Sequence, residues 1–181
     1  HHLAAFVCGE AFAAVSAEAG TLMPGRAVQD YAQLRFRLTG GARGTMTLCQ
    51  AAAGMDNHIA LRVLGAEGTI EWRHATHNEL RLAPLEGFPM TLSRGHAGLS
   101  PAARAATRIA RTGHPEGLHE AFANLYADFA ELAAARRLGC APDALATSVP
   151  GAAEGLAGLR FVNACLESDA SSGAWVMFPS A

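Results

Sequence analysis

Residues 113–139, GHPEGLHEAFANLYADFAELAAARRLG, carry clear start and stop signals for one long helix, around which the rest of the chain can be arranged. Pro115 suits the first helical position, where its missing N–H costs nothing. Glu116 and Glu120 lie near the positive end of the helix dipole, and Arg136 and Arg137 lie near its negative end. Gly139 can end the helix in a left-handed conformation. Apolar side chains recur at steps of four and three and predict one buried face: Leu118, Phe122, Leu125, Phe129 and Leu132.

Three polar residues surround the predicted start of this helix: His114, Glu116 and His119. A helix N-terminus presents free backbone N–H groups, and two imidazoles and a carboxylate beside it could meet a polar ligand. Alternatively, His114 caps the helix while Glu116 and His119 are simply solvated. Residue type and spacing leave both interpretations open. The two histidines point apart on a helix, so they do not form a metal-binding pair.

Length and composition predict one domain with a substantial core, spanning residues 1–181. Half of the 181 residues are hydrophobic, which suffices for a core of that size. The formal charge of −2 and the pI near 6.5 argue against a nucleic-acid partner, which would need a basic stripe. No apolar run approaches the roughly 20 residues of a membrane span, so no membrane partner is expected.

The basic residues and the cysteines exclude several kinds of chemistry. All 14 basic residues are arginine, which is a poor proton donor or acceptor near neutral pH because its pKa stays above about 12. This chain alone therefore cannot supply a lysine base or a Schiff base. Cys8, Cys49, Cys140 and Cys165 are widely spaced, without a CxxC pair. We expect buried free thiols and a cytoplasmic protein, with no metal site.

Apolar residues alternate with polar ones from about residue 11 to residue 94, which predicts a series of strands. The connections between them are too short for crossover helices, so neighbouring strands should be antiparallel. Glycine-rich turns mark two hairpins, at residues 40–44 and 65–68. The expected strands cover residues 12–17, 34–38, 45–51, 59–64, 69–73, 80–82 and 90–92.

Helical signals replace this alternation from Ser100 onward. Ser100 and Pro101 suit the N-cap and first position of a helix, and Pro150 opens another. The buried face of this last helix is predicted at Leu156, Leu159, Val162 and Leu166, and residues 174–178 could add a short strand. Strands followed by helices predict an α+β fold. We expect an open, mainly antiparallel sheet of about six or seven strands with helices packed on one face.

Other candidate sites have little support. His74 and His77 lie in a strand connection, with no cysteine nearby to complete a zinc site. No GxSxG, P-loop or GxGxxG motif is present. Arg104, Arg108 and Arg111 follow one another at steps of four and three. That basic edge could meet an acidic substrate, although a solvated face is the more common explanation.

The first residues suggest that the polypeptide was cut from something longer. Residues 2–7 have the pattern of a helix end with Gly9 as its stop, but no capping residue precedes them and an initiator Met is missing. A tag remnant is a competing explanation for His1 and His2 only.

Five motifs, in this order, resemble the C-terminal domain of the Gfo/Idh/MocA family of NAD(P)-dependent oxidoreductases, in its sugar-dehydrogenase-like branch. They are LAAFVCG at residues 3–9, GARGT at 41–45, LRVLGAEGTIEW at 61–72, GHPEG at 113–117 and GAW at 173–175. The resemblance implies a two-domain enzyme in which NAD or NADP is bound mainly by an N-terminal Rossmann domain. The present chain, as the C-terminal domain, would then form one wall of the substrate site. It would also form a homo-oligomer interface through its open sheet face.

The resemblance also implies which residues meet a sugar or polyol substrate. The family's catalytic lysine belongs to the first domain, and its catalytic histidine aligns just before residue 1, so we expect no catalytic or cofactor-binding residue here. His114 resembles a substrate-side residue of related enzymes, and Glu116, Arg108 and His2 are further candidates for substrate contact. The alternative is a stand-alone, non-catalytic α+β module for dimerisation or ligand binding. A metal-dependent hydrolase is disfavoured because the eight histidines are scattered.

Overall fold

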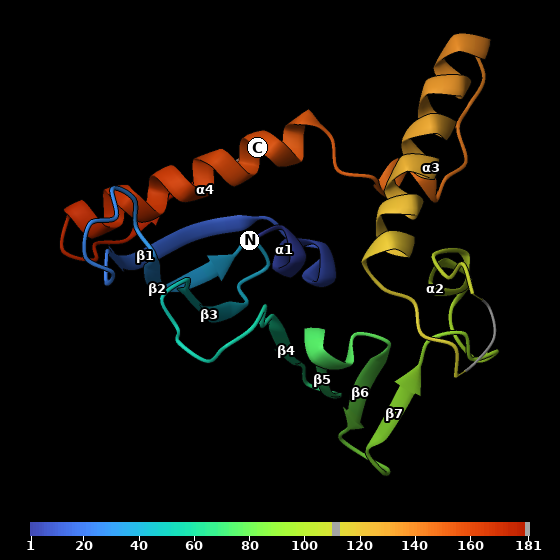
Figure 1. Ribbon diagram of the computed structural model, residues 1–181, viewed down its shortest axis with the longest axis horizontal. Coiled ribbons are helices and arrows are strands. Elements are labelled where there is room, and N and C mark those ends of the chain that lie inside the picture. Colours follow the sequence, from blue (N-terminus) through green and yellow to red (C-terminus); the bar gives the residue numbers. More distant parts are fainter. Residues whose placement is uncertain (110–112, 180–181) are drawn as a thin grey trace. The chain divides into compact units, whose positions relative to one another are not determined.

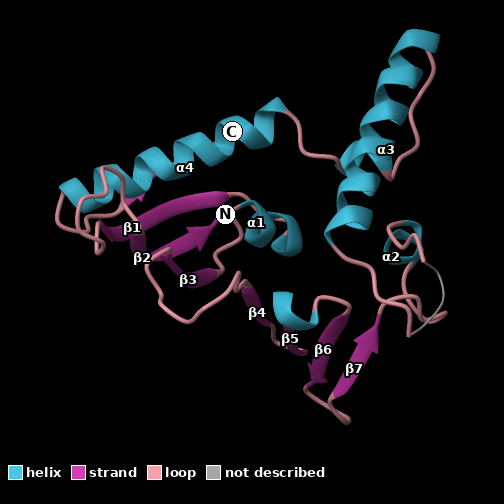
Figure 2. Cartoon of the chain, in the orientation of Figure 1, coloured by secondary structure: helices cyan, strands magenta, loops and turns pink. Residues whose placement is uncertain are grey.

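The computed structural model describes residues 1–109 and 113–179 of the chain (Figures 1 and 2). The chain forms two compact units, each of which is described by itself. The first comprises His1–Met55 with Pro150–Ala181, and the second comprises Asp56–Val149. Among the described residues, no helix is long and apolar enough to cross a membrane.

The first unit is a four-stranded antiparallel sheet with two helices. The sheet order is β3-β2-β1-β8, so the last strand returns to pair with the first. The helix α1 ends at Gly9, which adopts the left-handed conformation that the sequence predicts. The elements are α1 (His2–Cys8), β1 (Phe12–Gly20), β2 (Tyr31–Leu38), β3 (Arg43–Cys49), α4 (Ala152–Ala170) and β8 (Val176–Met177).

The core of the first unit lies between α4 and the face of the sheet that carries Val15 and Ala17. The prediction of which face of α4 is buried is wrong. Phe161 and the small residues Ala164, Cys165 and Ser168 are buried, which lets the helix approach β1 closely. The larger apolar residues are exposed on other sides of the helix: Leu156, Leu159, Val162 and Leu166.

The second unit contains a four-stranded antiparallel meander, in the order β4-β5-β6-β7. One face of the meander pairs Leu61, Trp72, Leu80 and Leu92 across all four strands. On the other face, Glu71 lies between Arg62 and Arg81, at N–O distances of 2.6 and 3.6 Å. The elements are β4 (Ala60–Leu64), β5 (Gly68–Arg73), η1 (His74–Thr76), β6 (Glu79–Pro84), β7 (Met90–Ser93), α2 (Pro101–Ala105), α3 (Leu118–Leu138) and η2 (Ala146–Ser148).

The α+β class and the antiparallel pairing are confirmed, as is the packing of α4 on one face of its sheet. The described residues form eight strands in two sheets of four, where the sequence suggested six or seven strands in a single sheet. The turn-rich segment 50–59, with Gly54 at a φ of 80°, separates β3 from β4, so the ladder is not continuous along the chain.

Two helices are shorter than the sequence suggested. Ser100 caps α2, its hydroxyl accepting from the N–H of Ala103 at 3.2 Å, but α2 is only five residues long. Arg108 therefore lies beyond its end, and the predicted basic edge also involves Arg111, which is outside the described residues. Helix α3 begins at Leu118, not at Pro115. In α3 only Ala135 is buried, so the predicted buried face is at least partly exposed along its length.

The four cysteines are free thiols. Cys165 is buried, and Cys8 is half-buried. The expectation of burial is wrong for Cys49 and Cys140, which are exposed. Cys49 ends the edge strand β3 and Cys140 follows the C-cap of α3, so neither position lies under another layer.

Candidate functional site

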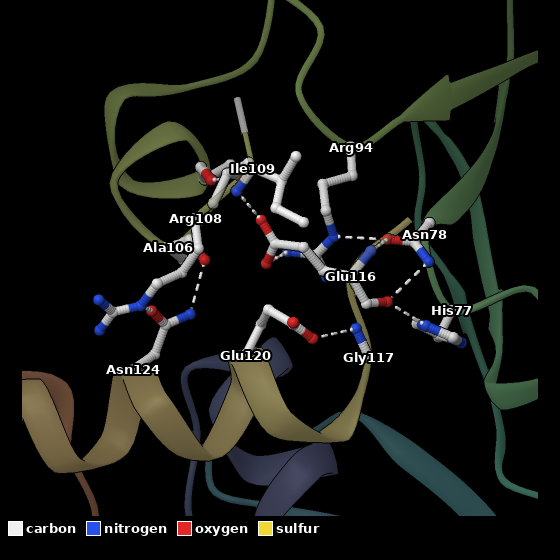
Figure 3. A network of polar contacts seen from close by, with 12 residues as sticks. His77, Asn78, Arg94, Ala106, Arg108, Ile109, Glu116, Gly117, Glu120 and Asn124 are labelled. Atoms are coloured by element: carbon white, nitrogen blue, oxygen red, sulfur yellow. Dashed lines mark hydrogen bonds and ion pairs between the residues drawn. The ribbon is translucent and has the colours of Figure 1, made fainter. Parts of the chain in front are cut away.

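The loop before α3, residues 113–117, is held by the side chain of Asn78 (Figure 3). The amide oxygen of Asn78 accepts from the backbone N–H of Glu116 at 3.1 Å, and its amide nitrogen donates to the backbone carbonyl of Glu116 at 3.0 Å. Asn78 therefore pairs with Glu116 as a neighbouring strand would. Because both backbone groups of Glu116 are engaged outside the helix, α3 cannot start before Gly117.

The carboxylate of Glu116 is buried, with its side chain 2% exposed. One oxygen lies 3.3 Å from a guanidinium nitrogen of Arg94, and the other accepts from the backbone N–H of Ile109. A buried carboxylate needs such partners, because an unpaired charge in the interior is costly. Glu116 thus joins three segments: the end of β7, the segment after α2 and the loop before α3.

Glu120 closes the first turn of α3. Its carboxylate accepts from the backbone N–H of Gly117 at 2.8 Å. This backbone hydrogen bond is the main reason why the pKa of Glu120 is lowered. The structure confirms that Glu120 lies at the positive end of the helix dipole, and it assigns the cap to Gly117. The interpretation of His114 as the cap is wrong.

His77, in the connection between β5 and β6, also contacts the backbone of Glu116. Its Nε2 faces the backbone carbonyl of Glu116, and its Nδ1 lies 3.1 Å from the carbonyl of His74. Both neighbours are hydrogen-bond acceptors, so a ring nitrogen that carries a hydrogen can donate to the carbonyl it faces. The indole N–H of Trp72 donates to the carbonyl of His77 at 3.1 Å and fixes this connection to β5.

The four candidate substrate residues lie in different environments. Glu116 is buried against Asn78 and Arg94, whereas His114 is exposed two residues earlier in the same loop. Arg108 is exposed and donates to the side chain of Asn124 at 2.6 Å and to the carbonyl of Ala123 at 2.8 Å, both on α3. His2 belongs to the other unit, where it is exposed on α1 and stacks on Phe6 with 6.3 Å between ring centroids.

The structure therefore brings Glu116 and Arg108 into one polar network (Figure 3). The segment that carries Arg108 is held on both sides of this residue. Ile109 donates to Glu116, and the amide of Asn124 donates to the carbonyl of Ala106 at 2.7 Å. His119 is exposed in the first turn of α3.

Asn78 and Arg94 were not recognised from the sequence. They lie 38 and 22 residues before Glu116, so no helical or strand periodicity connects them with it. For His77 the sequence suggests an exposed loop or, less favoured, a metal ligand, and it does not indicate the contact with the backbone of Glu116. A hint was available in the positions of these residues, since both Asn78 and Arg94 immediately flank strands whose ends meet in an antiparallel meander.

The described residues contain neither a cluster of metal ligands nor a parallel strand–glycine loop–helix unit. No group of three or more His, Cys, Asp or Glu side chains among them could hold a metal ion. Every strand pair in the described ranges is antiparallel. In dinucleotide-binding domains, a parallel strand–glycine loop–helix unit holds the pyrophosphate.

A separate cavity of about 520 Å³ lies in the first unit, on strands β1 to β3. Residues alternate in direction along a strand, so Ser16 faces away from the core that contains Val15 and Ala17. The hydroxyl of Ser16 accepts from Arg35 at 2.9 Å and donates to the carbonyl of Gly173 at 2.8 Å. This face is polar, and it is framed by Trp175, whose ring lies under two arginine side chains.

Known proteins share both the sequence and the fold of this chain. The family model described as the GFO/IDH/MocA C-terminal domain matches residues 1–71. The uncharacterized oxidoreductase YfiI of Bacillus subtilis (strain 168) is 33% identical over 153 residues, which is 83% of this chain and 38% of that protein.

Several solved structures are similar in fold to nearly the whole of this chain. An oxidoreductase from Sinorhizobium meliloti is 34% identical, with a TM-score of 0.90, over 97% of this chain and 49% of that one. An inositol dehydrogenase homolog from Azotobacter vinelandii, complexed with NADH and myo-inositol, is 29% identical, with a TM-score of 0.83, over 95% and 45%. The chain thus spans about half the length of these solved relatives. It belongs to the GFO/IDH/MocA family of oxidoreductases and is a C-terminal domain of that family.

Proposed function

We propose that residues 1–181 form the substrate-binding and oligomerisation domain of an NAD(P)-dependent oxidoreductase that acts on a sugar, a polyol or a related carbinol. The observation that carries the proposal is the anchored loop before α3. It buries Glu116 and leaves His114 exposed at a fixed place beside the helix start. The complex of the Azotobacter vinelandii homolog with NADH and myo-inositol supports the same substrate class.

In this proposal His114 hydrogen-bonds a substrate hydroxyl, because a neutral imidazole has one donor and one acceptor nitrogen, which suits a hydroxyl group. Arg108 and His2 are further proposed contacts. Glu116 contributes through the loop that it holds, since its carboxylate is occupied by Arg94 and by the backbone of Ile109. The hydride would pass between the nicotinamide and a carbinol carbon, with the proton-transferring base supplied from outside these residues.

The cofactor, NAD or NADP, would be bound mainly by another part of the protein. The antiparallel sheets described above support this division of labour, since they lack the unit that holds a pyrophosphate. The open face of the first sheet supports the proposed homo-oligomer. An exposed antiparallel face with both polar and aromatic groups, such as Arg35 and Trp175, can pair with the same face of a second copy.

The test is steady-state kinetics of the full-length protein with NAD⁺ or NADP⁺ and a panel of polyols that includes myo-inositol. Loss of one hydrogen bond to a hydroxyl should raise the KM of His114→Ala by about 2- to 10-fold. His58→Ala is the matched control, because His58 is exposed in the segment between β3 and β4. Equal kinetics of the two variants would refute the role of His114, and polyol binding without turnover would favour the non-catalytic module.

A further inference from the structure

Pro115 restricts the backbone of the loop that carries His114, and Glu116 supplies the contacts that fasten this loop to the rest of the unit. Gly113 adopts a left-handed conformation at a φ of 85° and Gly117 is extended, so glycines flank the loop on both sides. Glycine restricts the backbone least of all residues. Among the described residues, the hydrogen bonds made by residues 114–116 all involve Glu116. The direction of His114 therefore depends on how firmly Glu116 is held.

Asn78 and Arg94 act jointly to hold Glu116 in place. Arg94 donates from Nε to the amide oxygen of Asn78 at 2.8 Å and lies 3.3 Å from the Glu116 carboxylate through Nη1. The planar guanidinium can serve both acceptors at once, which a lysine ammonium does less well. The same amide oxygen of Asn78 also accepts from the N–H of Glu116. The three side chains thus form one closed set of contacts.

We propose that Asn78 and Arg94 are positioning residues for His114, because they fix Glu116 and thereby the loop that presents the imidazole to substrate. This inference rests on the proposed function of His114 as a substrate contact. Asn78 touches the backbone of Glu116 and Arg94 touches its side chain, so each acts on His114 only through the loop. A purely structural role would instead lower the stability of the unit without any specific link to His114.

A double-mutant cycle in the full-length protein separates these two roles. We expect Asn78→Ala to lower kcat/KM about tenfold for whichever polyol of the panel is turned over, a loss within the range for imperfect positioning. In a His114→Ala background the same substitution should change kcat/KM less than about twofold, since its route to substrate is already removed. Asn57→Ala is the matched control, an exposed asparagine of the same unit.

Hydrogen exchange measures the loop independently of activity. In Asn78→Ala the amide of Glu116 should exchange about fivefold faster, as expected for loss of one hydrogen bond. If Asn78→Ala does not fold, Arg94→Lys enters the same cycle, since it keeps a cation beside Glu116 but lacks the planar fork.

Equal losses of kcat/KM from Asn78→Ala in both backgrounds, or unchanged exchange at Glu116, would overturn the positioning role. If His114→Ala alone has no effect on kcat/KM, the proposed function of His114 fails as well. If His114→Ala lowers kcat/KM and Asn78→Ala does not, only the positioning role fails. The two failures are therefore distinguishable.

Discussion

Ser168 offers a sharp test of how the first unit is held together. It is fully buried in α4, with an exposed fraction of 0%. Its hydroxyl accepts from the backbone N–H of Ala17 at 2.9 Å and donates to the carbonyl of Ala174 at 2.6 Å. One side chain therefore joins the last helix to β1 and to the segment before β8. Replacing Ser168 with alanine leaves the buried N–H of Ala17 without this partner, whereas Ala174 is exposed and water can reach its carbonyl.

The expected cost of Ser168→Ala is about 1–3 kcal/mol in the free energy of unfolding, because one buried backbone N–H loses its hydrogen-bond partner. For a chain of this size such a change lowers the Tm by about 2–12 °C. Thermal denaturation followed by circular dichroism measures the shift. Ser171→Ala is the matched control, since Ser171 is exposed and the structure gives its side chain no hydrogen bond. We expect this control to lie within about 0.5 kcal/mol of the wild type.

A Tm of Ser168→Ala equal to that of the control would refute the reasoning. It would mean that the backbone groups of Ala17 and Ala174 find other partners without cost. A reduced Tm in both variants would instead indicate a general sensitivity of the end of α4. Ser168→Thr adds a methyl group while keeping the hydroxyl, so it distinguishes loss of the hydrogen bonds from loss of close packing.

Two further outcomes follow from the titratable groups. The pKa values of Glu120 and Glu154 are lowered from 4.5, mainly by hydrogen bonds from the N-cap backbone of their helices. The contribution of these carboxylates to stability is therefore complete above about pH 4.5. It is lost as the pH falls through their lower folded-state pKa values. Acid titration of unfolding should therefore be shallower in Glu120→Gln and Glu154→Gln, and an unchanged profile would contradict these caps. Burial raises the pKa of Cys165 to about 11, so at pH 8 a thiol reagent should label the exposed Cys49 and Cys140 first, and simultaneous labelling of Cys165 would contradict its burial.

Local signals in the sequence predicted the elements whose hydrogen bonds are also local. The stop of α1 at Gly9, the hairpin between β2 and β3 and the cap of α2 at Ser100 depend on residues within a few positions of one another. Alternation likewise identified β4 to β7 as an antiparallel meander, because each strand pairs with its neighbour in sequence. These features required no knowledge of distant contacts.

Features that depend on distant contacts were missed. In α4, both the large apolar residues and the small ones recur at helical spacing, and hydrophobicity alone selected Leu159 over Ala164. The structure buries Ala164 and leaves Leu159 66% exposed, since β1 approaches the side of the helix that carries small residues. The pairing of β8 with β1 and the hydrogen bond from the N–H of Ala17 to the hydroxyl of Ser168 also connect residues more than 150 positions apart.

Glu116 shows how one distant contact changes the interpretation of a site. By the dipole rule, a carboxylate in the sequence His-Pro-Glu-Gly belongs to the first turn of the helix, where it could meet a ligand directly. The structure gives that first-turn role to Glu120 and buries Glu116 against Arg94. The structure thus leaves the His114 side chain exposed and encloses the Glu116 carboxylate. In the proposed function, the substrate specificity of the enzyme therefore responds to substitution of His114, and the order of the loop responds to substitution of Glu116.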